Sequence, residues 1–333
     1  EYPEIFFEEK THIIRRVHPD PRQLNEAAEK LKLSKQPIII AGGGILYSEA
    51  EKELSDFAKK HNIPVTPTVM GIGCMTKDDP YYIGAIGCLG EGSSNSLSKD
   101  TDLALAIGTK LGDFTTGSWS NFQNEDFKLV SINTARFDVT KHLATPVISD
   151  AKIGLLELSK ALGDWRAPNN WYERSIDERK KWDSYVEKQS GPTNQELPSY
   201  AHAVGAVYRN ADPSDIVVTA AGGLVGEVVQ IWKPKELNTF ETEWGFSCMG
   251  YEISGALGIK MAKPDQDVIV FVGDGSYLLH NSDIYSSVLY DKKLIIVVCD
   301  NGGHMVINRL QLAKGGKEYL CNLKEARATN LQF

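Results

Sequence analysis

The sequence lacks every feature of an exported or membrane-spanning protein. No apolar run approaches the length of a transmembrane helix, and the first ten residues, EYPEIFFEEK, have neither a basic segment nor an apolar core of the signal-peptide type. It also lacks a stripe rich in lysine or arginine, and its formal net charge is −8 with a pI near 5.5. We therefore expect no membrane insertion and no binding to nucleic acid.

Cysteine is scarce and is not spaced as in a zinc site. Several of the thiols lie in apolar or glycine-rich stretches, where a reduced cysteine packs as a small hydrophobic residue. This usage predicts a reducing, cytoplasmic environment. The five cysteines are Cys74, Cys88, Cys248, Cys299 and Cys321.

The rest of the composition is that of a globular protein with two domains. The chain has 333 residues, of which 42% are hydrophobic and 24% charged. Two series of alternating strand and helix patterns indicate two doubly wound parallel sheets, that is, an α/β fold class. We predict a linker over residues 1–20, a central Rossmann-like domain over 21–164, a helical interdomain linker over 165–197, and a diphosphate-binding domain over 198–333.

The most informative segment spans residues 268–303. An apolar run, VIVFV, ends in Gly273-Asp274-Gly275-Ser276, and a second apolar run, LIIVVCD, ends in Asn301-Gly302-Gly303. Two buried parallel strands joined by a right-handed helical crossover end at the same edge of a sheet. The Asp274 carboxylate and the Asn301 amide should then be neighbours, and such oxygen ligands suit Mg²⁺ or Ca²⁺.

A lone GDG could also be an ordinary tight turn. The 27 positions that separate Asp274 from Asn301, with a strand, helix and strand around them, favour the metal site. With these motifs the chain resembles the thiamine-diphosphate-dependent enzymes. Within that superfamily, the segments EWGFSCMGYEISGALG, VGDGSYLL and INRLQ are similar to the trihydroxycyclohexane-1,2-dione hydrolases of myo-inositol catabolism, as are AGGGILYSEA, FAKKHNIPV, GTKLGDFTTGSW and INTARFD in the first half.

The resemblance covers the region from near residue 1 to about residue 311 and implies a domain arrangement. Subunits of this family carry a pyrimidine-binding, a central and a diphosphate-binding domain, and the chain resembles the second and most of the third. The glutamate that activates the cofactor belongs to the first domain. The resemblance therefore implies an incomplete and inactive fragment of a homodimeric or homotetrameric enzyme, with no secure catalytic residue in this chain.

The resemblance also assigns roles to individual residues. Asp274 and Asn301 would bind Mg²⁺ through their side chains and Gly303 through its carbonyl. Gly275 and Ser276 would hold the diphosphate of thiamine diphosphate, and Met249 would support its bent shape. The remaining residues assigned to the site are the Ser247 carbonyl on the aminopyrimidine, the loop Ala221, Gly222 and Gly223 beside the cofactor, and His304 as a possible proton donor.

Structural alternatives remain open for several of these residues. Met249 could be a core filler, Ser276 a helix cap, residues 221–223 a simple turn, and His304 a bystander. Gly42-Gly43-Gly44, between a strand and a helix, fits a dinucleotide loop, although the resemblance implies a scaffold role for the central domain.

The activity implied by the resemblance is hydrolytic cleavage of a carbon–carbon bond that opens 3D-(3,5/4)-trihydroxycyclohexane-1,2-dione to 5-deoxyglucuronate, a small-molecule reaction. Two alternatives remain. One is a carboligase or lyase like acetohydroxyacid synthase or 2-hydroxyacyl-CoA lyase, against which the EWGFSCMGYE and FTTGSW segments argue. The other is a fragment that binds diphosphate without turnover.

Overall fold

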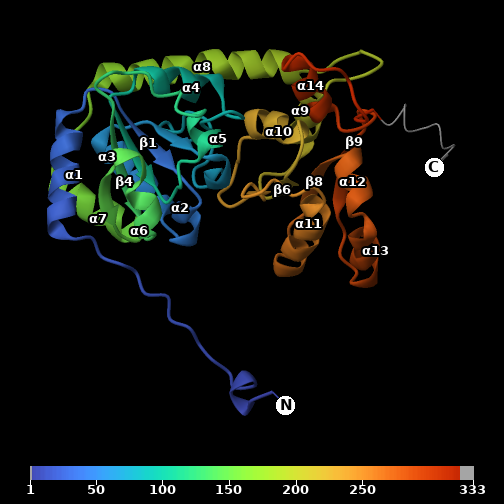
Figure 1. Ribbon diagram of the computed structural model, residues 1–333, viewed down its shortest axis with the longest axis horizontal. Coiled ribbons are helices and arrows are strands. Elements are labelled where there is room, and N and C mark those ends of the chain that lie inside the picture. The colour runs from blue at the N-terminus through green and yellow to red at the C-terminus, as the bar shows by residue number, and fades with distance from the viewer. Residues whose placement is uncertain (1, 323–333) are drawn as a thin grey trace.

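Two parallel β-sheets form the framework of the computed structural model, which describes residues 2–322 (Figure 1). Each sheet has helices on both faces, so the predicted α/β class with two doubly wound units is confirmed. Apart from the short 3₁₀ helix Glu4–Phe6, residues 2–20 form no helix or strand. The segment extends away from the body of the molecule up to Arg16 and Val17, which hydrogen-bond to Ser48 and Ser149 of the first unit. No helix in the described part of the chain is both long and apolar enough to span a membrane.

The first sheet has the strand order β2-β1-β3-β4-β5, with all neighbours parallel. Its strands are short apolar runs that are buried on both faces, as parallel sheets require. The order reverses between β1 and β3, where the chain crosses to the other side of the sheet. The strands are β1 (Pro37–Ala41), β2 (Val65–Pro67), β3 (Leu103–Ile107), β4 (Lys128–Asn133) and β5 (Thr145–Ile148).

Amphipathic helices cover this sheet. In α1, the Asp20 side chain accepts a hydrogen bond from the Arg22 amide at the N-terminus, and the apolar stripe of Ala27, Ala28 and Leu31 is buried against the core. The helices of this unit are α1 (Pro21–Leu33), α2 (Gly44–Tyr47), α3 (Glu51–His61), α4 (Gly92–Asp100), α5 (Asp113–Thr116), α6 (Arg136–Val139) and α7 (Ala151–Leu162).

The second sheet has the order β7-β6-β8-β9, again entirely parallel. Helices α9 and α10 cover one face and α11 covers the other. The strands are β6 (Ile216–Thr219), β7 (Phe240–Thr242), β8 (Val268–Gly273) and β9 (Ile295–Cys299). The helices are α9 (Tyr200–Asn210), α10 (Leu224–Ile231), α11 (Tyr251–Ala262), α12 (Asp274–Leu279), α13 (Ser282–Leu289) and α14 (Met305–Ala313).

The segment predicted as a helical connection contains α8 (Asn169–Ser190), which runs along the first unit and reaches the second (Figure 1). On the first unit, Trp171 of α8 is buried and donates a hydrogen bond to the Pro37 carbonyl at 2.8 Å. At its other end the Ser190 carbonyl accepts from Arg209 of α9. The connection is therefore a packed helix and not a free linker.

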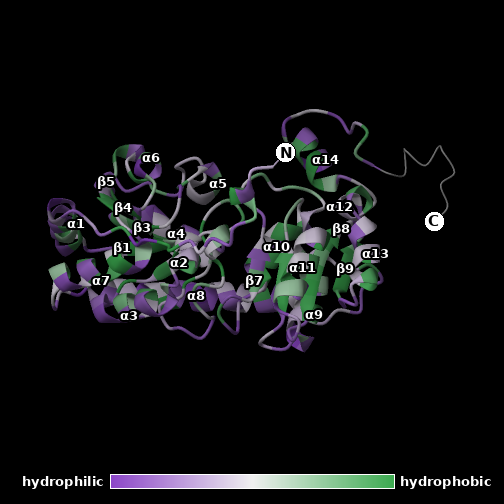
Figure 2. Cartoon of the chain, turned by 90° about the horizontal axis from the view of Figure 1, so that it is seen from below, coloured by the Kyte–Doolittle hydropathy of each residue, from purple (hydrophilic) through white to green (hydrophobic). Residues whose placement is uncertain are grey.

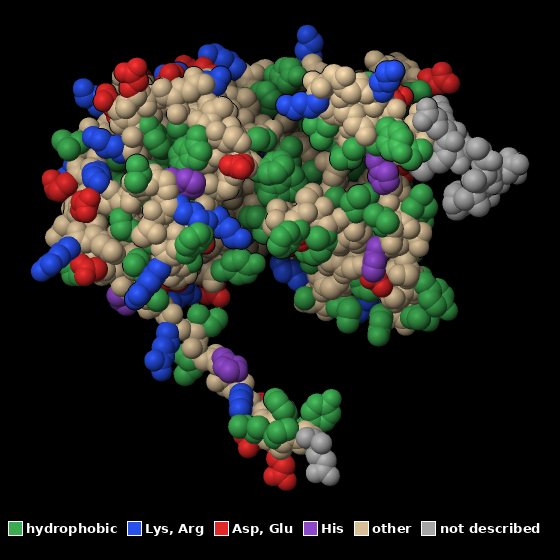
Figure 3. All heavy atoms as spheres, viewed as in Figure 1, with side chains coloured by type: hydrophobic (Ala, Val, Ile, Leu, Met, Phe, Trp, Pro, Cys, Tyr) green, Lys and Arg blue, Asp and Glu red, His purple; other side chains and the backbone are tan. Residues whose placement is uncertain are grey.

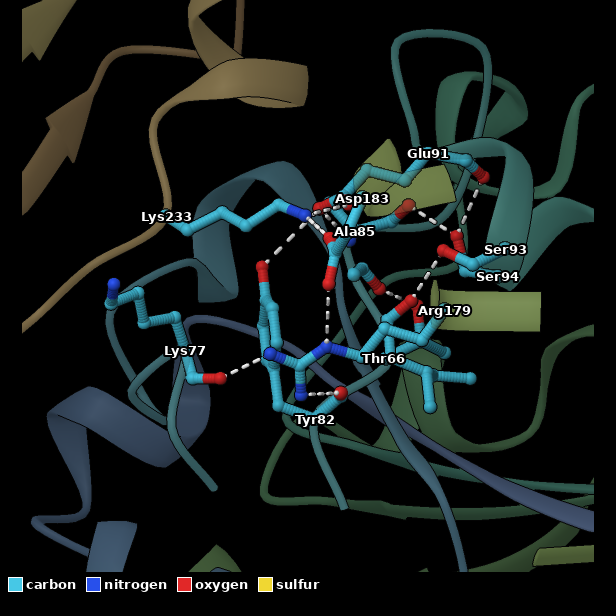
Figure 4. A network of polar contacts seen from close by, with 12 residues as sticks. Thr66, Lys77, Tyr82, Ala85, Glu91, Ser93, Ser94, Arg179, Asp183 and Lys233 are labelled. Carbon is cyan, nitrogen blue, oxygen red and sulfur yellow. Dashed lines mark hydrogen bonds and ion pairs between the residues drawn. The ribbon is translucent and has the colours of Figure 1, made fainter. Parts of the chain in front are cut away.

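A buried ion network fixes the two units against each other (Figure 4). Lys233, which follows α10, lies 3.3 Å from the Glu91 carboxylate of the first unit and also pairs with Asp183 of α8. Arg179 of α8 donates to the Tyr82 carbonyl at 2.6 Å. Burial raises the pKa of Glu91, and the Lys233 ammonium opposes that effect. Both members of the Lys233–Glu91 pair are buried, so removal of one would leave the other without a charge partner at that position.

Apolar side chains also cross between the units. Val69 and Ile72 of the first unit belong to the same buried cluster as Val217 and Phe271 of the second. The ring of Trp244 meets the ring of Phe114 edge to face, with 5.3 Å between the centroids. The units therefore form one continuous structure in addition to their separate cores.

The edge of the second sheet is less covered than the rest of the molecule. The residues of β9 are as hydrophobic as those of β1 and β8 (Figure 2), yet four of its five residues are only partly buried or exposed. Apolar side chains also gather over α13 in the space-filling view (Figure 3). The exposed apolar residues of α13 and the residue after it are Tyr285, Val288, Leu289 and Tyr290.

The structure differs from the prediction in the crossover between β8 and β9. The single helical crossover expected between β8 and β9 is two helices, α12 and α13, and the three-residue strand β7 precedes α11. The predicted diphosphate-binding domain ends at residue 333, so its last part, residues 323–333, lies outside the described residues.

Candidate functional site

Asp274 and Asn301 meet at one edge of the second sheet. Strands β8 and β9 are parallel, and Gly273 pairs in register with Cys299, so the two chains leave the sheet side by side. Asp274 is the next residue after β8, and Asn301 is the second residue after β9. The two predicted metal ligands therefore share the carboxyl edge, as the crossover geometry predicted.

The Asp274 carboxylate has an unused oxygen. The residue is 8% exposed, and its Oδ2 atom is buried without a hydrogen-bond partner. Burial raises the pKa of Asp274 and the Asp300 carboxylate raises it further, while the backbone N–H groups of Gly275 and Asn301 lower it. A buried carboxylate oxygen without a partner is costly unless a cation or donor binds it.

Asn301 is held at both ends of its amide group. Its Nδ2 donates to the Tyr200 hydroxyl at the start of α9, and its Oδ1 accepts from the Gly303 amide at 3.2 Å. Gly302 has φ 82° and Gly303 has φ 144°, conformations that favour glycine. This turn brings the Gly303 amide back to the Asn301 side chain.

Gly275, Met249 and His304 come together beside Asp274. A Cβ atom on Gly275 would lie 2.8 Å from Cε1 of His304 and 3.5 Å from Cε of Met249. A larger residue at this position would have to displace the exposed His304 ring. Met249 is 40% exposed, so it is not a buried core filler. Gly275, Met249 and His304, which are distant in the sequence, therefore lie close together in the structure.

The loop before α11 is held by carboxylates. Glu243 accepts hydrogen bonds from the Phe246 amide at 2.9 Å and the Cys248 amide at 2.7 Å. Ser247 has φ 53°, which is uncommon for a residue with a side chain, and its hydroxyl donates to the Ala220 carbonyl. The segment that carries Ser247 and Met249 is therefore a constrained turn beside the loop after β6.

Glu252 is the residue of this site that the sequence analysis missed. It is fully buried, and its carboxylate accepts from the Ala221 amide, the Gly250 amide and the Ser276 hydroxyl. The Ser276 hydroxyl thus binds Glu252 and makes no side-chain cap on α12. The available signal was helical spacing, since Glu252 lies four residues before the buried Ala256 on the apolar stripe of α11.

The donor set at the sheet edge fits a hard divalent cation. No group of three His, Cys, Asp or Glu side chains that could hold a metal occurs between residues 2 and 322. An ion here would therefore take the Asp274 carboxylate, the Asn301 amide oxygen and a backbone carbonyl such as that of Gly303. Mixed oxygen sets of this kind leave positions for water and phosphate on Mg²⁺.

The glycines at residues 42–44 are explained in part by packing. A Cβ on Gly42 would lie 2.3 Å from the Gly108 carbonyl oxygen, and one on Gly44 would lie 2.6 Å from the Gly108 Cα. The two turns after β1 and β3 therefore need glycine to approach each other. A cavity of about 480 Å³ borders Gly43, Gly44 and Trp244 at this edge of the first sheet.

Family models match both halves of the chain. The model described as the central domain of thiamine pyrophosphate enzymes matches residues 24–158, and the model described as their C-terminal TPP binding domain matches residues 220–332. The first match contains the whole of the first sheet, and the second contains β7, β8 and β9 together with all the predicted metal ligands.

Relatives named 3D-(3,5/4)-trihydroxycyclohexane-1,2-dione hydrolase are similar over nearly all of this chain. The protein of Bacillus anthracis is 34% identical over an alignment of 355 residues, which covers 98% of this chain and 55% of the relative. That of Clostridium tetani is 36% identical over 340 residues, 95% of this chain and 53% of the relative. That of Geobacillus thermodenitrificans is 34% identical over 356 residues, 100% of this chain and 54% of the relative.

The chain thus spans about half the length of these relatives. It carries the central domain and the C-terminal TPP binding domain in the order in which the family models match them. The chain belongs to the thiamine pyrophosphate enzymes.

Proposed function

We propose that the carboxyl edge of the second sheet binds Mg²⁺ and the diphosphate of thiamine diphosphate. The observation that carries the proposal is the buried Asp274 oxygen without a partner, next to Asn301. Asp274 would bind the ion through this oxygen, Asn301 through Oδ1, and Gly303 through its carbonyl. Since Gly303 donates to the same Asn301 Oδ1, that hydrogen bond must be weakened or shared when the ion binds.

The other assigned residues would shape the cofactor site. Gly275 and Ser276 offer backbone N–H groups of the first turn of α12 to the diphosphate. Met249 would support the cofactor from one side, with the Ser247 carbonyl as an acceptor and the Ala221 to Gly223 loop beside it. His304 touches the Gly275 position and could deliver a proton near the reacting atoms. When bound, thiamine diphosphate supplies the electron sink for cleavage next to a carbonyl.

For the whole protein we propose hydrolytic ring opening of 3D-(3,5/4)-trihydroxycyclohexane-1,2-dione to 5-deoxyglucuronate in inositol catabolism. The support is the name of the relatives, together with 34 to 36% identity over nearly all of this chain. The two segments that distinguish this family in the sequence, around Phe114 and Trp244, are in contact. Their contact supports a shared role in that part of the site.

We also propose a cytoplasmic homodimer or homotetramer. The five cysteines are all free thiols, in agreement with a reducing compartment. The exposed apolar side chains of α13 support assembly, because large exposed apolar patches mark association sites. Light scattering would test this, and a monodisperse monomer at micromolar concentration would contradict it.

Two experiments test the proposed function at separate levels. Calorimetric titration of thiamine diphosphate into this chain should show binding that requires Mg²⁺, and no binding with the metal present would refute the cofactor site. Incubation of the full-length protein with the dione, Mg²⁺ and cofactor should open the ring. Carbon–carbon bond formation from pyruvate would instead favour the carboligase alternative, and binding without any turnover would favour a diphosphate-binding fragment.

A further inference from the structure

Glu252 is a buried carboxylate that touches three separate loops. It is 0% exposed and lies in the first turn of α11. Its hydrogen-bond partners come from the loop after β6, the turn before α11, and the first turn of α12. These are the same three segments that carry the residues proposed to contact the cofactor. No other described carboxylate joins them.

Each oxygen of Glu252 acts as an acceptor. Oε1 accepts from the Ala221 amide at 3.1 Å. Oε2 accepts from the Gly250 amide at 2.9 Å and from the Ser276 hydroxyl at 2.8 Å. The Ser276 oxygen in turn accepts from the Gly250 amide at 2.7 Å. Two of the three donors are backbone N–H groups, which cannot reverse their role.

The charge of the carboxylate is balanced by the backbone and not by a cation. Glu252 forms no salt bridge within residues 2–322. It is instead the second residue of the twelve-residue helix α11, where the helix dipole favours a negative charge. Three donors converge on it there, so the buried group is satisfied. An arrangement of this kind holds backbone segments in place without presenting a charge to the site.

We propose that Glu252 is a positioning residue: an acceptor-only group that sets the spacing of the Ala221, Gly250 and Ser276 segments around the cofactor. Through Gly250 it fixes the turn that presents Met249, and through Ser276 it fixes the first turn of α12 next to Asp274. Glu252 itself is 0% exposed, so it would not touch the cofactor. The expected effect on cofactor binding rests on the proposed function. The hydrogen bonds that Glu252 accepts from Ala221, Gly250 and Ser276, which we call the hub, do not depend on it.

The geometry makes a carboxylate necessary at this position. Glutamine has the same shape but carries one NH₂ group, and that group must face either the Ala221 N–H or the Gly250 N–H. Either orientation places two donors against each other. Aspartate is shorter by one methylene and cannot reach both loops from α11. If Glu252 only filled space, glutamine could replace it without effect.

Amide hydrogen exchange on the full chain, without cofactor, tests the hub. In Glu252→Gln we expect the exchange of the Ala221 or the Gly250 amide, whichever faces the NH₂ group, to accelerate on the order of tenfold or more. In Ser276→Ala, exchange at Gly250 should accelerate while exchange at Ala221 stays as in the wild type. Asp265→Asn is the matched control, because Asp265 is an exposed carboxylate of the same domain, and it should change neither amide.

Calorimetry with Mg²⁺ and thiamine diphosphate tests the consequence. The Kd should rise about tenfold or more in Glu252→Gln, rise less in Ser276→Ala, and stay unchanged in Asp265→Asn. Circular dichroism establishes that each variant is folded, and Ser276→Ala keeps the test open should Glu252→Gln fail to fold.

The outcomes separate this inference from the proposed function. Wild-type amide exchange and wild-type Kd in Glu252→Gln would overturn the positioning role and leave the cofactor site intact. Faster exchange in Glu252→Gln, together with a wild-type chain that binds no cofactor, would support the role of Glu252 in holding the three segments and would refute the cofactor site. Faster exchange with an unchanged Kd would overturn the proposed link between the hub and cofactor binding.

Discussion

The two sheets of this molecule differ in how completely the chain covers them. In the first sheet, β1 and β3 are buried at every position, and helices close both faces. In the second, β9 is an edge strand of the same apolar character whose Val298 is 44% exposed. The difference agrees with the proposed function, in which the first unit is a scaffold and all the predicted ligands lie in the second unit. On that proposal a scaffold can be closed, whereas a unit that would bind cofactor, substrate and another subunit must keep surface available.

The comparison also shows where the two units depend on each other. The first unit contributes Glu91 and Phe114 to contacts with Lys233 and Trp244 of the second. The turn that bears Trp244 continues into the segment of Ser247 and Met249. The first unit therefore packs against the part of the second unit that leads into the segment of Ser247 and Met249.

The largest effect should come from a cavity in the closed sheet. Ile39 of β1 is 0% exposed, so Ile39→Ala should lower the free energy of unfolding by about 4 kcal/mol, because it removes buried methylene groups and leaves a void. Val298→Ala on β9 should lower it by less than about 1 kcal/mol. Denaturant unfolding of both variants measures the difference, and equal losses would contradict the contrast between the sheets.

Breaking the ion network between the units should have the next largest effect. In Glu91→Gln, Lys233 keeps Asp183 but loses its buried partner, so we expect a loss of about 3 kcal/mol in the free energy of unfolding. The two units should also unfold less cooperatively. Calorimetric unfolding would show a broadened or split transition. Glu236→Gln, an exposed carboxylate near Lys233 in sequence, serves as the control and should leave the transition unchanged.

Replacing a predicted metal ligand should affect binding more than stability. Asp274→Asn removes the charge while keeping the shape, so Mg²⁺-dependent affinity for thiamine diphosphate should fall by at least about 100-fold, since even the outer partners of metal ligands contribute 10- to 100-fold. Thermal unfolding without cofactor should be unchanged or slightly higher, because the buried charge is lost. Unaltered affinity would remove Asp274 from the site.

The smallest effect should be a pH dependence in the closed unit. His61 is fully buried between the Trp165 carbonyl and the Ser159 hydroxyl, and burial lowers its pKa from 6.5. The unfolded chain then binds a proton that the folded chain does not, so the stability held above pH 6.5 decreases as the pH falls below it. His61→Gln should show a shallower decrease than the wild type in denaturant unfolding at several pH values. Identical slopes would contradict the assignment.

The fold and the placement of Asp274 and Asn301 at one sheet edge were predictable because their signals are local or regularly spaced. Five-residue apolar runs mark the parallel strands, and the strand, helix, strand context places Asp274 and Asn301 at one edge. Glu252 was missed because its partners are 2 to 31 residues away in the sequence and lie on three loops. Lys233 and Glu91 were missed for the same reason, since only the packed structure brings their charges together.

The proposed function depends most on where the divalent ion binds. Crystals of this chain grown with Mn²⁺ and thiamine diphosphate, measured at the manganese absorption edge, would locate the ion directly. We expect one anomalous peak at about 2.0 to 2.3 Å from an Asp274 carboxylate oxygen and the Asn301 Oδ1, with diphosphate oxygens completing the coordination. A cofactor bound with its metal elsewhere, or an anomalous peak that touches neither residue, would contradict it.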